Sequence, residues 1–270
     1  MLNQLIFPGI SLFFFLLERL FPKRQQPIIR EAFWTDLAHI IFNAYIFGIF
    51  SSYMMVWIAE NLPALKPWWS RVEAVHLVSQ QPLWLQALVL FVLKDFVQWL
   101  IHNLLHRVSW LWAFHKVHHS IEIMDWMGNM RYHWIEPLIY RMLQYIPIAV
   151  CGFDPKIFFW MGAFDLAMGY FNHSNLNASI GPLKYIFNSP GMHIWHHDAR
   201  VPTCNLGIAL SVWDWIFGTA YYPAEENRNL LGFKGVENYP KNWLTQLFVP
   251  LTLLLKRAPQ KANTSATTES

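Results

Sequence analysis

Two copies of one histidine spacing constrain this chain more than any other feature of its sequence. The pattern His-x-x-His-His occurs at 115–119 and again at 193–197, and a His-x-x-x-His pair at 102–106 precedes the first copy. In a helix, residues three or four positions apart share a face, so each cluster can direct imidazoles toward a common centre. Neutral imidazole is a good ligand for iron, copper, nickel and zinc. The spacing therefore predicts a metal centre built on helices.

The size of the histidine set favours two metal ions over one. A structural zinc ion takes about four ligands, whereas nine of the twelve histidines in this chain have such spacing or follow a helical run on the same side. A lone histidine is more often a hydrogen-bonded core residue than a ligand, and His39 and His76, which have no companions, are expected to be structural. The predicted ligands are His102, His106, His115, His118, His119, His173, His193, His196 and His197.

The apolar runs predict an all-α integral membrane protein. Hydrophobic residues make up 54% of the chain, aromatic residues 17% and charged residues only 14%, which is typical of membrane proteins. The mean hydropathy of +0.23 indicates that much of the chain still lies outside lipid. We expect a bundle of about four to five transmembrane helices in a single domain, residues 1–256, followed by a disordered tail, 257–270. The expected spans are 4–21, 33–59, 82–106 and a hairpin at 138–173, and the expected histidine-rich helical cap comprises 107–137 and 174–256.

Basic residues predict which side of the membrane carries the cap. Lys23, Arg24 and Arg30 follow the first span and mark the first loop as cytoplasmic. The second and third spans then return the chain to that side, where Arg107 and Lys116 agree with the assignment. The sequence therefore predicts a multi-pass protein whose histidine cluster faces the cytoplasm. No cleavable signal peptide is indicated, so the first apolar segment is expected to stay in the protein.

Several classes of function lack their signatures. A net charge of +3 without a basic run argues against nucleic-acid binding. Cys151 and Cys204 lack CxxC spacing, so neither a disulfide framework nor a thiolate metal site is indicated. There is no HExxH motif, P-loop or Gly-x-Ser-x-Gly elbow, and the carboxylate ligand set of di-iron bundles is missing. The expected centre is therefore dominated by histidine, with no catalytic residue assigned beyond the metal centre.

Three further residues are candidates for support of the metal centre. His133 is either a tenth ligand or a residue behind the ligands, and Glu136 could hydrogen-bond His133 or orient a neighbour. Asp95 precedes His102 by two helical turns, so it lies on the same face of a largely apolar span. Asp165 is rotated away from the histidine face, and a partner such as Lys94 or Tyr170 is as plausible as a role in catalysis.

The histidine motifs and their surroundings resemble the fatty acid hydroxylase and sterol desaturase superfamily of membrane di-iron oxygenases. The likeness extends over residues 17–222, and its specific parts are KDFVQWLIHNLLHR, LWAFHKVHHS, MRYHWIEP, NHSN, MHIWHH and NLGIALSVWDWIFGT. It implies O2-dependent hydroxylation or desaturation of a lipid C–H bond, with two irons held by the nine histidines. The chain departs from the pattern at Asn177, where some members have a second histidine, and at Asn103, where an arginine is common.

The resemblance leaves the substrate and product open. A sterol-like or fatty-acyl lipid fits an apolar tunnel, and an alcohol or an alkene would follow from the same hydrogen abstraction. No haem-binding or flavin-binding domain is visible, so electrons are expected from a separate ferredoxin, rubredoxin or cytochrome-type donor that docks near Arg107, Lys116 and Arg200. The alternatives are a membrane haem- or metal-binding carrier or transporter without oxygen chemistry, and a scaffold in which zinc substitutes for iron.

Overall fold

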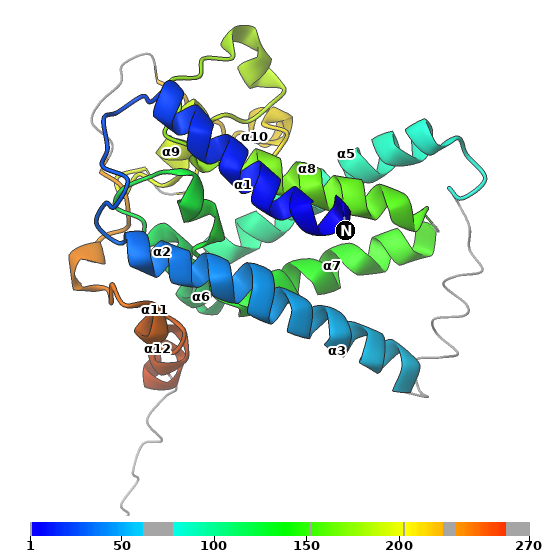
Figure 1. Cartoon of the computed structure of the whole chain (residues 1–270), viewed down its shortest axis with the longest axis horizontal. Coiled ribbons are helices and arrows are strands. Elements are labelled where there is room, and N and C mark those ends of the chain that lie inside the picture. The colour runs from blue at the N-terminus through cyan, green and yellow to red at the C-terminus, as the bar shows by residue number, and fades with distance from the viewer. Residues whose placement is uncertain (1, 62–77, 152, 202, 224–229, 258–270) are drawn as a thin grey trace, which may run out of the picture.

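Helices form nearly all the regular structure of the chain (Figure 1), in a computed structural model that describes residues 2–61, 78–151, 153–201, 203–223 and 230–257. Within these ranges no β-strand forms, and extended residues meet only in isolated bridges. The expected all-α fold is therefore confirmed. Residues 258–270 of the predicted tail, and His76 with most of the segment that follows the second expected span, lie outside the described residues.

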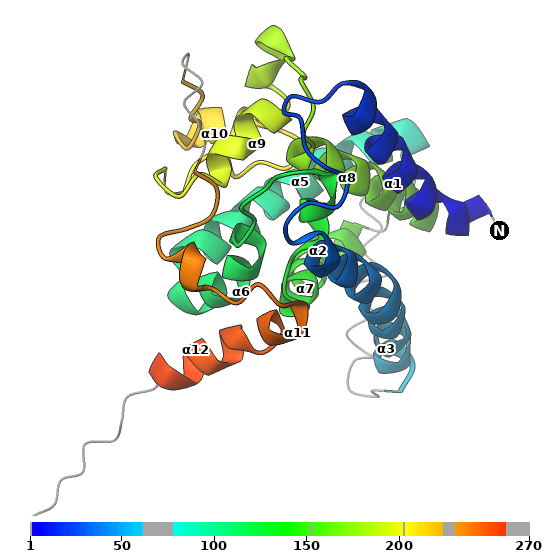
Figure 2. The ribbon, with the colours of Figure 1, turned by 60° about the vertical axis from the view of Figure 1, so that its left-hand side comes forward.

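Long helices form one part of the molecule and short helices cover its other end (Figures 1 and 2). The long ones are α1 (Leu2–Leu20), the continuous run of α2 (Phe33–Ile40), η1 (Ile41–Phe47) and α3 (Gly48–Asn61), α5 (Leu83–Arg107), α7 (Ile135–Cys151) and α8 (Pro155–His173). The short ones are α6 (Ser109–His119), η3 (Trp126–Met130), η4 (Gly181–Tyr185), α9 (Pro190–His196), α10 (Val212–Phe217), η5 (Val236–Asn238), α11 (Trp243–Gln246) and α12 (Val249–Arg257).

Two of the expected spans meet the requirements for crossing a membrane. Among the described residues, Phe33–Ser51 and Leu83–Arg107 are long enough and apolar enough to span a bilayer. The helices α1, α7 and α8 coincide with the other expected spans, but they do not meet the same requirements of length and hydropathy. The bundle of four to five spans therefore remains a prediction.

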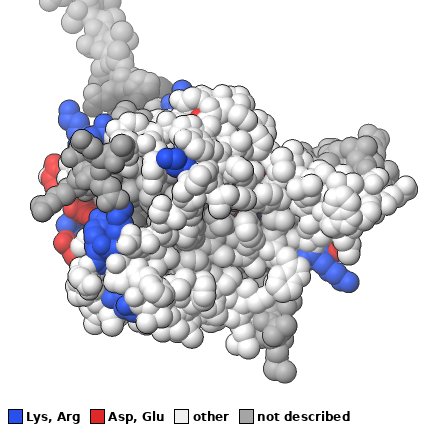
Figure 3. Space-filling view, turned by 90° about the horizontal axis from the view of Figure 1, so that it is seen from above, with Lys and Arg blue, Asp and Glu red and all other residues white. Residues whose placement is uncertain are grey.

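The charged side chains gather at the end that carries the short helices. On the face shown in Figure 3, most Lys and Arg side chains lie toward the left, where Figure 1 shows α2, α9 and α11. Much of the remaining surface on this face carries no charged side chain. On the long helices α5 and α8, the aromatic side chains of Trp84 and Trp160 are largely exposed. A surface divided in this way is typical of a protein with an apolar region and a polar cap.

A π-helical turn in the second long helix holds the segment that follows η3. The η1 segment contains Asn43, whose side-chain amide donates to the carbonyl oxygens of Met130 at 2.9 Å and Tyr132 at 3.0 Å. Single π-helical turns inside α-helices often occur at functional sites. Here the turn fixes both neighbours of Arg131, whose own carbonyl oxygen contacts a histidine described below.

A buried network of two arginines and two aspartates holds the same segment from the other side. The Asp36 carboxylate accepts from Arg30 at 2.7 Å and also from Arg131, while Arg30 donates to Asp125 at 2.6 Å. All four side chains are at least nine-tenths buried. Buried charges require such pairing because removing one partner leaves an uncompensated charge in a medium of low polarity.

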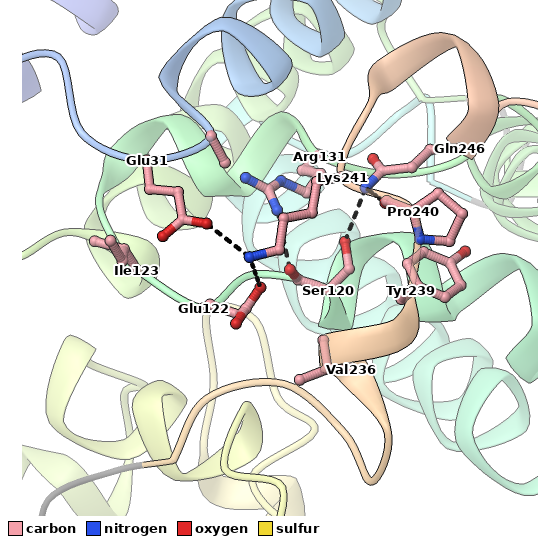
Figure 4. A pocket seen from close by; sticks show the side chains of 11 residues that line it. Glu31, Ser120, Glu122, Ile123, Arg131, Val236, Tyr239, Pro240, Lys241 and Gln246 are labelled. Atoms are coloured by element: carbon pink, nitrogen blue, oxygen red, sulfur yellow. Dashed lines mark hydrogen bonds and ion pairs between the residues drawn. The ribbon is translucent and has the colours of Figure 1, made fainter.

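The C-terminal segment lines a pocket beside Arg131, one member of this network (Figure 4). Lys241 Nζ contacts a carboxylate oxygen of Glu31 at 2.6 Å and one of Glu122 at 3.2 Å. Nearby, the Gln246 amide oxygen is 2.9 Å from His39 Nε2, and its amide nitrogen is 3.4 Å from the Ser120 hydroxyl. His39 therefore has the structural role expected for it, and three segments distant in sequence are held together at the cap.

Candidate metal centre

Four helix ends bring the predicted ligands to one place. His102 and His106 occupy the last turns of α5, and Val108, in an extended conformation, reverses the chain into α6. Helix α6 carries the first His-x-x-His-His copy, α8 ends at His173, and α9 carries the second copy, whose last member is its C-cap. Helix α5 packs against both α6 and α8, and α8 packs against α9, so the two His-x-x-His-His copies, which are more than 70 residues apart in the sequence, become neighbours.

The nine histidines form two adjacent groups, and within each group the candidate ligand atoms lie within 4.8 Å of one another. Each His-x-x-His-His copy is divided between the groups, so the spacing alone did not show which residues act together. His115 and His119 of the first copy belong to one group and His118 to the other. The second copy is divided in the opposite sense, with His196 in the group of His115 and with His193 and His197 in the group of His118. One group comprises His102, His106, His115, His119 and His196, and the other comprises His118, His173, His193 and His197.

Five of the imidazoles are oriented by an acceptor at Nδ1. Four donate to backbone carbonyl oxygens, and because a carbonyl oxygen can only accept, the proton in each must reside on Nδ1. The fifth, His115, lies with Nδ1 2.8 Å from a carboxylate oxygen of Glu136. The four carbonyl contacts are His102 to Leu206 at 2.7 Å, His118 to Arg131 at 3.0 Å, His173 to Gly169 at 2.8 Å and His196 to Cys204 at 2.8 Å.

This orientation makes the Nε2 lone pairs converge. The Nε2 atoms of His102 and His115 are 3.1 Å apart, as are those of His118 and His173. Because Nδ1 carries the proton in a neutral ring held in this way, two facing Nε2 atoms cannot hydrogen-bond to each other. A cation bound by both atoms would remove the repulsion, and a separation of 3.1 Å is one that two nitrogen ligands of the same metal ion can have at metal–nitrogen bonds of about 2.1 Å. The donor set therefore fits a metal ion in each group.

Unsatisfied nitrogen atoms support the same interpretation. The Nε2 atoms of His106, His119 and His196 are buried and have no hydrogen-bond partner among the described residues. All three belong to the five-membered group. Buried polar atoms in proteins are nearly always paired, so three orphaned nitrogens in one cluster indicate an absent partner.

Burial keeps the cap imidazoles in the form that binds metal. Desolvation by burial, followed by the influence of neighbouring imidazoles, holds the pKa values of His115, His119 and His197 well below the usual histidine value. A protonated imidazole cannot bind a metal, so these rings are in the ligand form at neutral pH.

The Glu136 carboxylate contacts His115, one of the predicted ligands. Its side chain lies against His115, while only its backbone N–H contacts the His133 carbonyl oxygen. Burial raises the pKa of Glu136 to about 8, and a cation at the imidazole groups acts in the opposite direction. Carboxylates behind metal-binding histidines fix the tautomer and raise the basicity of the ring. The second carboxylate oxygen of Glu136 is buried without a partner among the described residues.

His133 is not placed as a tenth ligand. Its Nδ1 accepts from the Ile135 N–H at 3.2 Å and its Nε2 lies 3.0 Å from the Leu247 carbonyl oxygen. Both ring nitrogens are therefore engaged away from the two histidine groups, and the ring packs against Phe114. These contacts favour the second of its two expected roles, a residue outside the ligand set, and they connect the segment before α7 to Leu247 of the C-terminal segment.

Asp95 supports the histidines indirectly, through a loop. Its carboxylate accepts from the backbone N–H groups of Ala209 and Leu210 and from the Trp213 indole at 2.8 to 3.2 Å. It was expected to lie close behind His102, but among the described residues its hydrogen-bond partners do not include a histidine. Asp214 holds the other end of the same loop through the N–H groups of Leu206 and Gly207. Together the two aspartates fix the Leu206 carbonyl oxygen that orients His102.

A cavity of about 320 Å3 adjoins the histidine groups between α5, α7 and α8. Its histidine wall includes His102, His115, His118 and His173, with Glu136 beside them. Lys94 and Asp165, which form an ion pair with each other, also line it, so Asp165 has one of its two expected partners. The cavity is therefore bounded by members of both histidine groups.

The profile of the family described as "Fatty acid hydroxylase" matches residues 87–219, a range that contains all nine histidines. Ornithine lipid hydroxylase OlsE of Rhizobium tropici is 30% identical over 245 residues, which cover 88% of this chain and 72% of that protein. The chain belongs to the fatty acid hydroxylase family. It is accordingly an oxidoreductase.

Other relatives of this fatty acid hydroxylase are alkylglycerol monooxygenases. The Xenopus tropicalis protein is 32% identical over 161 residues, which cover 58% of this chain and 35% of the relative. The Homo sapiens protein is 28% identical over 188 residues, which cover 67% and 37%. This chain thus spans about a third of their length. No solved structure matches it.

The sequence did not reveal the acceptors behind the histidines of this fatty acid hydroxylase. Four of the five are backbone oxygens, which have no residue signature. Arg131 and Asp36 could have been noticed, because charged residues in apolar surroundings are expected to be paired. Arg141 and Gln144, which line the cavity, could not be separated by pattern from other polar residues of α7.

Proposed function

We propose that this chain is a membrane-embedded, non-haem di-iron oxygenase that hydroxylates a C–H bond of a lipid with O2 and external electrons. The observation that carries the proposal is the convergence of nine buried imidazoles in two adjacent groups, with Nε2 lone pairs facing one another. Family membership supports lipid oxidation, and the names of the relatives favour hydroxylation over desaturation.

Each histidine group would hold one iron. His102, His106, His115, His119 and His196 would bind the first, and His118, His173, His193 and His197 the second. When bound, the iron pair supplies the redox chemistry that activates O2 toward an unactivated C–H bond. The residues of the chain orient the ligands, through carbonyl oxygens and Glu136, and surround them with a buried shell that limits access of water.

A haem-carrier function would explain only some of the clustered histidines. Bis-histidine haem requires one imidazole from each of two helices, whereas here imidazoles from α5, α6, α8 and α9 meet in two groups. Imidazole binds zinc as well as iron, so a metal analysis is needed to distinguish a zinc-binding scaffold from an iron enzyme. Both alternatives predict a protein that does not incorporate oxygen into lipid.

The arrangement in the membrane is part of the proposal. We propose that the long helices form the multi-span bundle and that the histidine cap lies on the cytoplasmic side, in agreement with the basic residues gathered at that end (Figure 3). A separate ferredoxin, rubredoxin or cytochrome-type protein would supply electrons there. The relatives named for ornithine lipid and alkylglycerol favour an acyl- or ether-chain lipid over a sterol as substrate.

Isotope labelling of cellular lipids tests the proposed function. Cells that express the chain, a His118→Ala variant or no protein are grown under 18O2, and their lipids are compared by mass spectrometry. The proposal predicts a lipid that carries one 18O atom only in cells with the unaltered chain. Equal 18O lipid in the His118→Ala cells, or a product that carries no 18O, contradicts it.

A further inference from the structure

We propose that Arg141 binds an anionic group, a carboxylate or phosphate, at the polar end of the lipid and so directs oxidation to C–H bonds near that end. The inference rests on the proposed function, because it assigns the substrate class and the position of attack at the same site. It starts from the cavity beside the histidines, whose lining includes charged and amide side chains as well as apolar ones.

Within the described parts of the chain, Arg141 is the cation of this cavity that has no carboxylate partner. Lys94 is paired with Asp165, and Glu136 is engaged by His115. Among the described residues, Arg141 forms no ion pair and donates one hydrogen bond, to the hydroxyl oxygen of Ser51. A guanidinium has five N–H donors in a planar fork, so most of its donors remain for a ligand. Carboxylates and phosphates match that fork with two parallel hydrogen bonds.

A second unsatisfied donor lies beside it. Gln144 follows Arg141 by three positions on α7 and also lines the cavity, and its amide nitrogen is buried without a hydrogen-bond partner among the described residues. Positions three apart lie on the same face of a helix. Two donors therefore face the cavity from adjacent turns, which indicates a ligand with several acceptor oxygens.

The geometry of α7 limits the distance between the anion and the oxidised bond. Glu136, which contacts the ligand His115, precedes Arg141 by five residues on the same helix. At 1.5 Å per residue their backbones are about 7.5 Å apart along the axis. A lipid whose anionic group contacts Arg141 therefore presents carbons near its polar end to the histidines, and the middle of its chain lies farther away.

An apolar groove along the same helices suits the rest of the lipid. Leu83, Trp84 and Phe91 of α5 and Ile157, Trp160 and Phe164 of α8 line it. The cavity uses the following part of each helix, from Lys94 on α5 and from Asp165 on α8. Groove and cavity therefore follow one another along α5 and α8, with apolar residues at one end and polar residues beside the histidines. An acyl chain in the groove leaves its polar end in the cavity.

Lipid binding and product analysis together test the assignment. Dissociation constants are measured for the metal-loaded, detergent-purified protein with three lipids of one acyl chain: an N-acyl amino acid, a lysophosphatidic acid and a neutral monoacylglycerol. The unaltered protein is expected to bind one or both anionic lipids about 10- to 100-fold more tightly than the neutral lipid. In Arg141→Gln this preference should fall to less than about threefold, and Arg141→Lys should retain part of it. Lys156→Gln, which removes an exposed positive charge at the start of α8, is the matched control and should keep the full preference.

The outcomes separate this inference from the proposed function. Equal binding of the three lipids by the unaltered protein, or an undiminished preference in Arg141→Gln, overturns the role of Arg141. If Arg141→Gln does not fold, the preference of the unaltered protein and its reduction in Arg141→Lys decide. Tandem mass spectrometry of the 18O product should place the hydroxyl near the polar end, and a hydroxyl in the middle or at the far end of the chain overturns the predicted position. Absence of any 18O product contradicts the proposed function, while the binding measurements still decide the role of Arg141.

Discussion

Replacement of Glu136 by glutamine tests whether residues that hydrogen-bond the predicted ligands strengthen metal binding. The Glu136 carboxylate lies 2.8 Å from His115 Nδ1, and both side chains are at least 95% buried. Glutamine keeps the shape and an acceptor oxygen for Nδ1, so the change removes mainly the negative charge behind the imidazole. We expect the fold to persist and the metal to be held less firmly.

The magnitude follows from the type of contact. A hydrogen bond to a charged group contributes about 1.5–3 kcal/mol, and about 1.4 kcal/mol corresponds to a tenfold change in an equilibrium constant. Loss of the charge should therefore weaken metal binding about 10- to 100-fold, which is the usual range for residues directly behind a metal ligand. The amide nitrogen, placed where the second carboxylate oxygen has no partner, adds a small cost at most.

Chelator competition provides the assay. Iron retained by the purified protein is measured against increasing chelator for the unaltered chain, Glu136→Gln and the control Glu122→Gln. Glu122 is exposed and contacts Lys241 at the surface, where an ion pair contributes little, so the control should bind metal normally. Retention by Glu136→Gln equal to that of the control would refute the assigned role of Glu136.

Three further predictions concern stability and reactivity. Asp36→Asn leaves two buried guanidinium groups with one aspartate and should lower the free energy of unfolding by about 3–5 kcal/mol; chemical denaturation measures it, and a loss under about 1 kcal/mol would contradict the buried network. Gly207→Ala should greatly reduce the yield of folded protein, because the added carbon would lie 2.3 Å from a backbone carbonyl oxygen, whereas Gly162→Ala, with open space around it, should be tolerated; size-exclusion profiles compare them. Burial raises the pKa of the Cys204 thiol to about 12. In a variant that lacks Cys151, we therefore expect a thiol reagent at pH 8 to label the protein only after denaturation. Rapid labelling of the native protein would show that the segment around Cys204 is open to solvent.

The sequence predicted the members of the histidine set because their spacing is a local property of helices. All nine predicted residues lie in the two groups. It could not predict how His118 and His119 divide between the groups, because that depends on the reversal at Val108 and on the packing of α8 against α9. Helical periodicity gives the face of a residue, and the partner on that face comes from tertiary structure.

The supporting residues show the same limit. Asp95 lies in the apolar third span as expected, but its partners are backbone N–H groups of a loop more than 100 residues away. His133 belongs to a family motif, and its two contacts are with the backbone of Ile135 and Leu247. Neither set of contacts can be inferred from the spacing of residues along the sequence. By contrast, Glu136 could be predicted as a group that orients a neighbour, because carboxylates near clustered histidines commonly do so.

The number and kind of metal ions in the purified protein test the central claim most directly. Protein produced in iron-supplemented medium is purified in detergent, its metals are quantified by elemental analysis, and its visible absorption spectrum is recorded. The account predicts about two irons per chain, one for each histidine group, and no Soret band. A haem Soret band, a single metal ion per chain, or zinc retained in place of iron would contradict it.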